Sequence, residues 1–246
     1  MKIRTVSLAT LVLGASFALL PLQAADKSTA PAKAAPAGFV SLFDGKTLNG
    51  WSGLPDHWKV EEGSIIGYTT KDNPLKNNTF LVWTNGVVDN FELHFKYRIF
   101  RGNSGVQYRS TLMDPEKFIV GGYQADIEAG KTYSGILYEE RMRGILAERG
   151  QRTVITEENG KTKVSVIGKL ADSADLQAGI RSEDWNDYII IADGNHLIHM
   201  INGRATIDVM DEQASKAAKS GILGLQIHVG EPMMVQFKEI KLKRLQ

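Results

Sequence analysis

The sequence has no cysteine, no long apolar run and no excess of charge, and each absence narrows the possibilities. Without cysteine there can be no disulfides, no thiolate metal ligands and no lipid attached to a cysteine. The apolar stretch at residues 11–20 falls well short of the roughly 20 residues that span a membrane. The net charge is +1 and no basic stripe is present, so nucleic-acid binding is disfavoured.

The first 38 residues differ in composition and residue pattern from the rest of the chain. Residues 1–24 combine a basic start, an apolar centre and a small residue at the end, which predicts a secretory signal peptide and export to the periplasm or the medium. Residues 25–38 are rich in alanine, proline and lysine, which predicts a flexible linker. Residues 39–246 have a uniform composition with no second linker, which predicts one domain that is large enough for a sizeable core.

Apolar and polar residues alternate with a period of two over most of this domain, which indicates strands. Pairs such as Asn159-Gly160 and Asn202-Gly203 separate the strands and favour tight hairpin turns. About a dozen strands in one domain predict an all-β fold, a sandwich or jelly roll of two antiparallel sheets. Helix is scarce, and we expect it only at residues 211–219 and near residues 171–178.

Five strand-like segments carry polar residues on alternate positions while the intervening positions are mostly apolar. Successive side chains of a strand point to opposite faces, so one face is core and the other collects the polar groups. The mixture of acid, imidazole, guanidinium and amide suits a site for a polyhydroxylated ligand. The pairs are Glu92/His94, Gln107/Arg109, Gln124/Asp126, Glu139/Arg141 and Gln226/His228.

Motifs over almost the whole domain occur in an order that resembles the 3-keto-disaccharide hydrolase family. Each motif is weak alone, and the ordered set carries the resemblance. The motifs are FVSLFDGKTLNGW (39–51), WKVEEGSIIG (58–67), FELHFKYRI (91–99), GNSGVQYR (102–109), GGYQADI (121–127), GILYEE (135–140), WNDYIIIADGNHLIHMING (185–203) and GILGLQIHVGEPMMVQFKEIKLK (221–243).

The resemblance implies a concanavalin A-like jelly roll that cleaves glycosides oxidised to a ketone at sugar C3. It also implies a partner oxidoreductase, a sugar 3-dehydrogenase, that makes the ketone. Such a ketone acidifies the hydrogen on C2. A general base can then remove it, the group on C1 leaves by β-elimination, and water adds to the product. Direct hydrolysis remains an alternative.

Three residues are candidates for the catalytic groups. Asp126 and His228, on the polar faces of apolar strands, are the candidate base and acid. Arg109 could stabilise an enolate oxygen, or it could neutralise a buried Asp126 in a purely structural ion pair. A structural histidine in the core or at the rim is the competing interpretation of His228.

Amide and aromatic side chains are candidates for sugar binding. Gln107, Gln124 and Gln226 can each donate and accept a hydrogen bond, as sugar hydroxyls require, although they could instead pair across the sheet. Tyr138 is a candidate platform for a sugar ring, and Asn103 is a candidate rim contact in a hairpin turn.

Glu139 and Arg141 complete the substrate-binding candidates, on a strand whose local geometry is less certain. The sequence GILYEERMRGILA departs here from related sequences, with Glu140 and Arg143 added. If Asp126, Glu139 and His228 converge they could hold a divalent metal, and this possibility stays open.

Two other functions fit the same residues. A carbohydrate-binding module without catalysis needs only the amides and aromatic side chains. A surface interaction domain without a sugar ligand would instead show a flat apolar patch and no cleft.

Overall fold

The computed structural model describes residues 38–246. The predicted signal peptide, and all but the last residue of the predicted linker, lie outside the described residues. No helix in residues 38–246 is long and apolar enough to cross a membrane.

Strands dominate the described domain, in agreement with the period-two pattern. Besides the strands there is one short α-helix, α1 (Ser173–Ala178), and a 3-10 turn at Pro55–His57. The strands are β1 (Val40–Ser41), β2 (Trp51–Ser52), β3 (Trp58–Glu61), β4 (Ser64–Tyr68), β5 (Thr79–Trp83), β6 (Phe91–Arg101), β7 (Asn103–Asp114), β8 (Ile119–Glu128), β9 (Leu137–Glu140), β10 (Gly144–Ala147), β11 (Gln151–Glu158), β12 (Lys161–Lys169), β13 (Asn186–Asp193), β14 (His196–Ile201), β15 (Arg204–Asp211), β16 (Ile222–Ile227) and β17 (Met234–Arg244).

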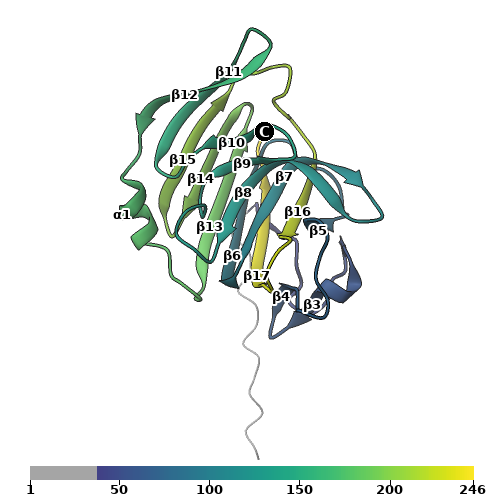
Figure 1. The fold of residues 1–246 in the computed structure, drawn as a ribbon. Helices are drawn as coiled ribbons and strands as arrows, with labels where there is room; N and C mark the ends of the chain where they lie inside the picture. The colour runs from purple at the N-terminus through teal and green to yellow at the C-terminus, as the bar shows by residue number, and fades with distance from the viewer. Residues whose placement is uncertain (1–37) are drawn as a thin grey trace, which may run out of the picture. The chain divides into compact units, whose positions relative to one another are not determined.

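The strands form two sheets (Figure 1). The ten-stranded sheet runs β12-β11-β15-β14-β13-β6-β17-β4-β3, with β1 paired to β17. The seven-stranded sheet runs β10-β9-β8-β7-β16-β5-β2. Neighbouring strands are antiparallel except β11 and β15, which run parallel. The predicted all-β sandwich of two sheets is confirmed.

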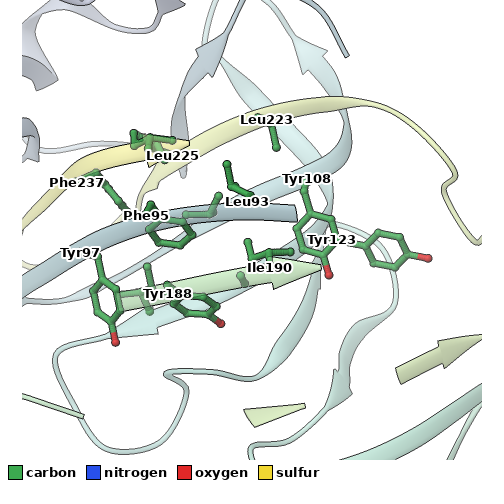
Figure 2. Close-up of a cluster of buried hydrophobic side chains, with 14 of the residues drawn as sticks. Leu93, Phe95, Tyr97, Tyr108, Tyr123, Tyr188, Ile190, Leu223, Leu225 and Phe237 are labelled. Atoms are coloured by element: carbon green, nitrogen blue, oxygen red, sulfur yellow. The ribbon is translucent and has the colours of Figure 1, made fainter. Parts of the chain in front are cut away.

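One apolar cluster joins the inner faces of the two sheets. On β6 every second residue is buried, which matches the alternation in its sequence. Phe95 stacks on Tyr188 with ring centroids 5.1 Å apart, and Tyr108 stacks on Tyr123 at 5.6 Å. Figure 2 shows these aromatic side chains packed with aliphatic residues of both sheets. This core covers one face of the seven-stranded sheet and leaves its other face for a site.

The Asn-Gly pairs form the hairpin turns that the sequence predicts. Asn159 and Gly160 join β11 to β12 with φ of 53° and 73°, and Asn202 and Gly203 join β14 to β15 with 48° and 78°. Both positions need positive φ, which asparagine and glycine tolerate better than other residues.

Of the two predicted helices, only the one near residues 171–178 forms, as α1. The prediction of a helix at residues 211–219 is wrong. Asp211 is the last residue of β15, and its carboxylate bonds to Arg143. The buried Gln213 is held by the same arginine and by Glu157, so these contacts fix the segment as turns.

Candidate functional site

A polar cleft opens on the face of the seven-stranded sheet that points away from the core. Its volume is about 720 Å³, within the range of small-molecule sites. Strands β7, β8, β9 and β10, together with the loops after β4, β6, β8 and β16, supply its walls. The lining residues are Asn78, Gly102, Asn103, Gln124, Asp126, Glu128, Ala129, Gly130, Tyr133, Ile136, Tyr138, Glu140, Ile145 and His228.

Strand β8 forms the centre of the cleft, because its side chains point alternately to the core and to the cleft. Tyr123, Ala125 and Ile127 enter the core, so the residues between them face the cleft. Gln124 lies over Gly105 on β7, where a Cβ atom would come within 2.6 Å of the Gln124 Cγ. A glycine at this position therefore makes room for the glutamine side chain.

Asp126 is the most perturbed acid in the cleft. It is only 5% exposed and accepts hydrogen bonds from Asn103 Nδ2 at 3.0 Å and from the Ile127 amide at 2.9 Å. In the part of the chain that the structure describes, it has no ion-pair partner. Burial raises its pKa to about 8, the two donors oppose this shift, and the charges of Glu128 and Glu140 add to it.

Glu140 faces the same cleft and was not among the predicted site residues. Asn78 Nδ2 donates to its carboxylate at 3.2 Å and Gln226 Nε2 approaches it at 3.5 Å. The Nε of Arg141 lies 3.9 Å away, so the ion pair is loose. The two-residue alternation from Tyr138 to Glu140 was the signal that could have found it.

Three glutamines form a layer of amides beneath the cleft. The amides of Gln107 and Gln124 are 3.0 Å apart, and Gln226 Nε2 donates to Gln124 Oε1 at 2.9 Å. Gln107 and Gln226 are fully buried, and Gln124, which is 2% exposed, lines the cleft. The structure thus shows cross-strand pairing, with Gln124 as the one member that reaches the open space.

Three more of the predicted residues line the cleft. Tyr138 lies beside Glu140, and burial raises the pKa of its hydroxyl, which therefore stays protonated. His228 is half-buried at the rim, and its Nδ1 lies 2.5 Å from the Val229 carbonyl oxygen. Asn103 holds Asp126, as described above.

Arg109 does not line the cleft. The register of β7 against β8 shifts between Tyr108 and Thr111, and Arg109 has a positive φ of 46°. This bulge turns the guanidinium toward the Asp89 and Gly194 carbonyls, at 2.6 Å each. The predicted contact of Arg109 with the reacting sugar, and its alternative ion pair with Asp126, therefore have no geometric basis in this structure.

Glu139 and Arg141 also lie outside the cleft lining. Glu139 points into the opposite, core-facing side of β9, where Arg143 Nε donates to it at 2.5 Å. Arg141 sits in the exposed turn after β9 with a φ of 60°. The two were expected to share one face, but the strand ends between them and the alternation stops.

The metal site weighed for Asp126, Glu139 and His228 does not assemble, because Glu139 lies on the other face. Within residues 38–246 no group of three or more histidine or acidic residues is arranged to hold a metal ion. The remaining pair, Glu92 and His94, bond to each other at 2.5 Å on β6 in the other sheet.

Two proteins of known structure resemble the described fold. A candidate glycosyl hydrolase from Parabacteroides distasonis superposes with a TM-score of 0.54 at 19% identity, covering 85% of this chain and 94% of that protein. The carbohydrate-binding module CBM66 from Bacillus subtilis gives 0.50 at 16% identity, covering 79% and 95%. At these identities the likeness concerns the fold alone.

Sequence comparison is more specific. A 3-keto-disaccharide hydrolase from Bacteroides thetaiotaomicron is 33% identical over a segment that covers 29% of this chain and only 27% of the relative. The 3-keto-alpha-glucoside-1,2-lyase-like domain matches residues 38–243, nearly the whole described part. The expected family resemblance is therefore confirmed, and the chain belongs to the 3-keto-alpha-glucoside-1,2-lyase-like domain family.

Proposed function

We propose that this protein cleaves the glycosidic bond of sugars oxidised to a ketone at C3, and that the cleft around Asp126 is its active site. The observation that carries the proposal is a buried carboxyl without an ion-pair partner, placed in a cleft among groups that bind hydroxyls. Family membership supports the substrate class. Perturbed acids in clefts concentrate at catalytic sites.

The proposed reaction is a β-elimination. The base takes the hydrogen from C2, and its electron pair forms an enolate with the C3 oxygen. The enolate then expels the oxygen on C1, which leaves as an alcohol after gaining a proton. The products are an unsaturated 3-keto sugar and the free alcohol. Addition of water to the unsaturated sugar makes the net reaction a hydrolysis.

Asp126 is the proposed base. A carboxylate whose conjugate acid has a pKa of about 8 is a stronger base than an ordinary aspartate, which suits the weakly acidic hydrogen on C2. Asn103 fixes the orientation of this carboxylate. Only the ionised form is reactive, so we expect the rate to rise with pH.

Two further groups fit the other steps. The protonated hydroxyl of Tyr138 donates a hydrogen bond to the enolate oxygen, which replaces the role expected for Arg109. His228, at the open rim, donates the proton to the leaving alcohol. Gln124, the one glutamine of the three that lines the cleft, binds a sugar hydroxyl.

The proposal also covers where the protein acts and which enzyme supplies its substrate. We propose export through the signal peptide at residues 1–24 to the periplasm or the medium. A sugar 3-dehydrogenase, which oxidises C3 of a glycoside, would supply the substrate.

The test is incubation of the purified protein with a 3-keto-disaccharide in deuterated water, with and without divalent metal, followed by mass spectrometry. Cleavage with deuterium at C2 is the expected result. Cleavage without deuterium points to direct hydrolysis or to return of the same proton, and a protein that leaves the substrate intact under every condition is not this enzyme.

A non-catalytic sugar-binding module is the second candidate, favoured by the amides and tyrosines of the cleft. The substitution Asp126→Asn separates the two. A binding module would keep its sugar affinity and show no turnover before or after the change, whereas the proposed enzyme loses turnover and keeps affinity.

A further inference from the structure

The cleft continues beyond the proposed catalytic groups into a smaller pocket of about 300 Å³. The loop after β8, strand β10 with the turn after it, and the first residue of α1 supply the walls of this pocket. Tyr133, Ile136 and Ile145 line both the cleft and the pocket, so the pocket is an extension of the cleft. The cleavage proposed above involves none of these three side chains.

The strand register sets the direction of this extension. Tyr138 on β9 is paired with Gln124 on β8 on one side and with Ile145 on β10 on the other. Side chains directly opposite each other in antiparallel strands lie on the same face, so these three form a row across the sheet. Neighbouring strands are about 4.8 Å apart, so the row spans roughly 10 Å from Gln124 to Ile145. A single sugar ring does not fill this length.

Tyr133 and Ile145 form an open apolar surface at the far end of the row. Each residue is 44% exposed, so a ligand that lies in the cleft can contact both side chains. A tyrosine has an apolar ring and a polar hydroxyl, which together suit the apolar face and the hydroxyls of a sugar ring. This end of the cleft therefore offers an accessible surface for a second ring.

Hydrogen bonds to the backbone fix the loop that carries Tyr133. The Glu128 carboxylate accepts from the backbone amides of Thr132, at 3.1 Å, and of Tyr133. The Arg149 guanidinium donates to the Ser134 carbonyl oxygen at 2.7 Å. The loop therefore presents the tyrosine in one position before a ligand binds, which lowers the entropic cost of binding.

The charged groups of the pocket favour a neutral ligand. Lys131 and Glu148, one of each sign, are exposed at its margin, so neither sign dominates. Arg149 also lines the pocket, but it is only 6% exposed and its guanidinium donates to backbone carbonyl oxygens. It is therefore not available to an anion. A further neutral sugar unit meets these conditions.

The cleavage proposed above decides which part of a substrate reaches the pocket, and in this respect the inference rests on the proposed function. His228, which protonates the oxygen leaving C1, follows β16, whereas Tyr138, which bonds to the oxygen on C3, lies on β9. The order of these strands in the sheet is β10-β9-β8-β7-β16. In a sugar ring C4 follows C3 and lies opposite C1. The C4 side of the oxidised ring therefore faces β10 and the pocket.

We propose that the pocket lined by Tyr133 and Ile145 is a subsite for a second neutral sugar unit, which is attached at C4 of the oxidised ring. The leaving group on C1 lies at the other end of the cleft, near His228. The protein thus accepts oxidised units that carry a further sugar at C4, and not only terminal units.

The kinetic test compares two substrates of the purified protein. In cellobiose oxidised at C3 of its non-reducing ring, the second ring is the leaving group and does not reach Tyr133. In cellotriose oxidised at C3 of its middle ring, C4 carries a further glucose unit. The ratio of kcat/KM for the trisaccharide to that for the disaccharide should fall about tenfold in Tyr133→Ala, through a higher KM for the trisaccharide. The loop is held through its backbone, so this variant should keep its fold.

A binding measurement separates the subsite from the cleavage. Unoxidised cellotriose has no C3 ketone and is not a substrate of the proposed elimination. In a nuclear magnetic resonance titration we expect it to shift the backbone amides of Thr132 and Ile145. Its dissociation constant should be about fivefold weaker in Tyr133→Ala, as loss of an aromatic contact predicts.

Met142→Ala is the matched control. Met142 is 53% exposed in the turn after β9 and lines neither the cleft nor the pocket, so its substitution should change neither the ratio nor the affinity. If neither oxidised substrate is cleaved while cellotriose shifts Thr132 and Ile145, the proposed reaction fails and sugar binding in the pocket is upheld. Cellotriose that leaves both amides unshifted, or a ratio that Tyr133→Ala does not change, would overturn the subsite.

Discussion

Glu139 and Glu140 are adjacent on β9, yet their carboxylates lie in opposite environments. Glu139 faces the core, where Arg143 bonds both to it and to Asp211, and all three side chains are at most 2% exposed. Glu140 faces the cleft, where its neighbours are amides, a loosely placed Arg141 and the acid Asp126. In the first cluster one guanidinium bonds to both carboxylates, whereas in the second the Arg141 Nε lies 3.9 Å from Glu140 and does not pair with Asp126.

The contrast separates a structural use of buried charge from a functional one. A buried carboxylate costs several kcal/mol unless it is paired, and the core cluster meets that requirement with Arg143. The cleft leaves Asp126 unpaired, which disfavours folding at high pH but yields a strong base. Sites that perform chemistry commonly carry such a cost.

The largest effect is expected from a substitution of Asp126 in the cleft. Replacing it with asparagine keeps the shape and removes the base, so kcat/KM on a 3-keto-disaccharide should fall by about 10²–10⁴. Thermal unfolding near neutral pH should show no loss of stability. The control Asp208→Asn changes a carboxylate paired with Arg152 in the other sheet and should leave the rate unchanged.

The core cluster should respond in the opposite way. Arg143→Met leaves Glu139 and Asp211 buried without their cation, which should lower the free energy of unfolding by about 3–5 kcal/mol. Urea unfolding of the purified protein measures this change. A loss below 1 kcal/mol would mean that the cluster is not a compensated ion-pair network.

The pH dependence of folding stability tests the unpaired burial of Asp126 in a second way. The folded protein holds a proton on Asp126 up to a pKa of about 8, whereas the unfolded chain releases it near pH 4. The stability linked to this proton is present at low pH and is lost as pH rises toward 8. From pH 5 to pH 9 the stability of Asp126→Asn should therefore gain up to about 4 kcal/mol relative to the unaltered protein. Equal pH dependence in both proteins would contradict the raised pKa.

Much of this arrangement was predictable from alternation alone. Gln124 and Asp126 on β8, Tyr138 on β9 and the amide of Gln226 on β16 lie on the faces that their sequences predict. Around these residues the strands keep their register against their neighbours, so a period of two holds there.

The misplaced residues lie where alternation is interrupted. Arg109 lies within a register shift in β7, and Arg141 follows the end of β9, so each side chain leaves the face that its paired residue occupies. A bulge adds one residue to a strand, so every later side chain points to the opposite face of the sheet. No residue type predicts a bulge reliably. Glu140 was missed although alternation holds there, because β9 keeps its register against β8 and places Glu140 on the same face as Tyr138.

The smallest expected effect concerns Glu140. Its charge raises the pKa of Asp126, so Glu140→Gln should lower that pKa and shift the rising limb of the rate profile to lower pH. Burial is the larger cause, so the shift should be below about one pH unit. Profiles of both proteins, measured side by side, decide this, and a shift to higher pH would exclude a like-charge interaction.

The most direct test of the account is the pH dependence of kcat/KM on a 3-keto-disaccharide. If ionised Asp126 is the base and its removal of the C2 hydrogen limits kcat/KM, the rate should rise about tenfold per pH unit below 8 and level off above it. A rate that is flat or that falls as pH increases across this range would contradict the assignment of Asp126 as the catalytic base.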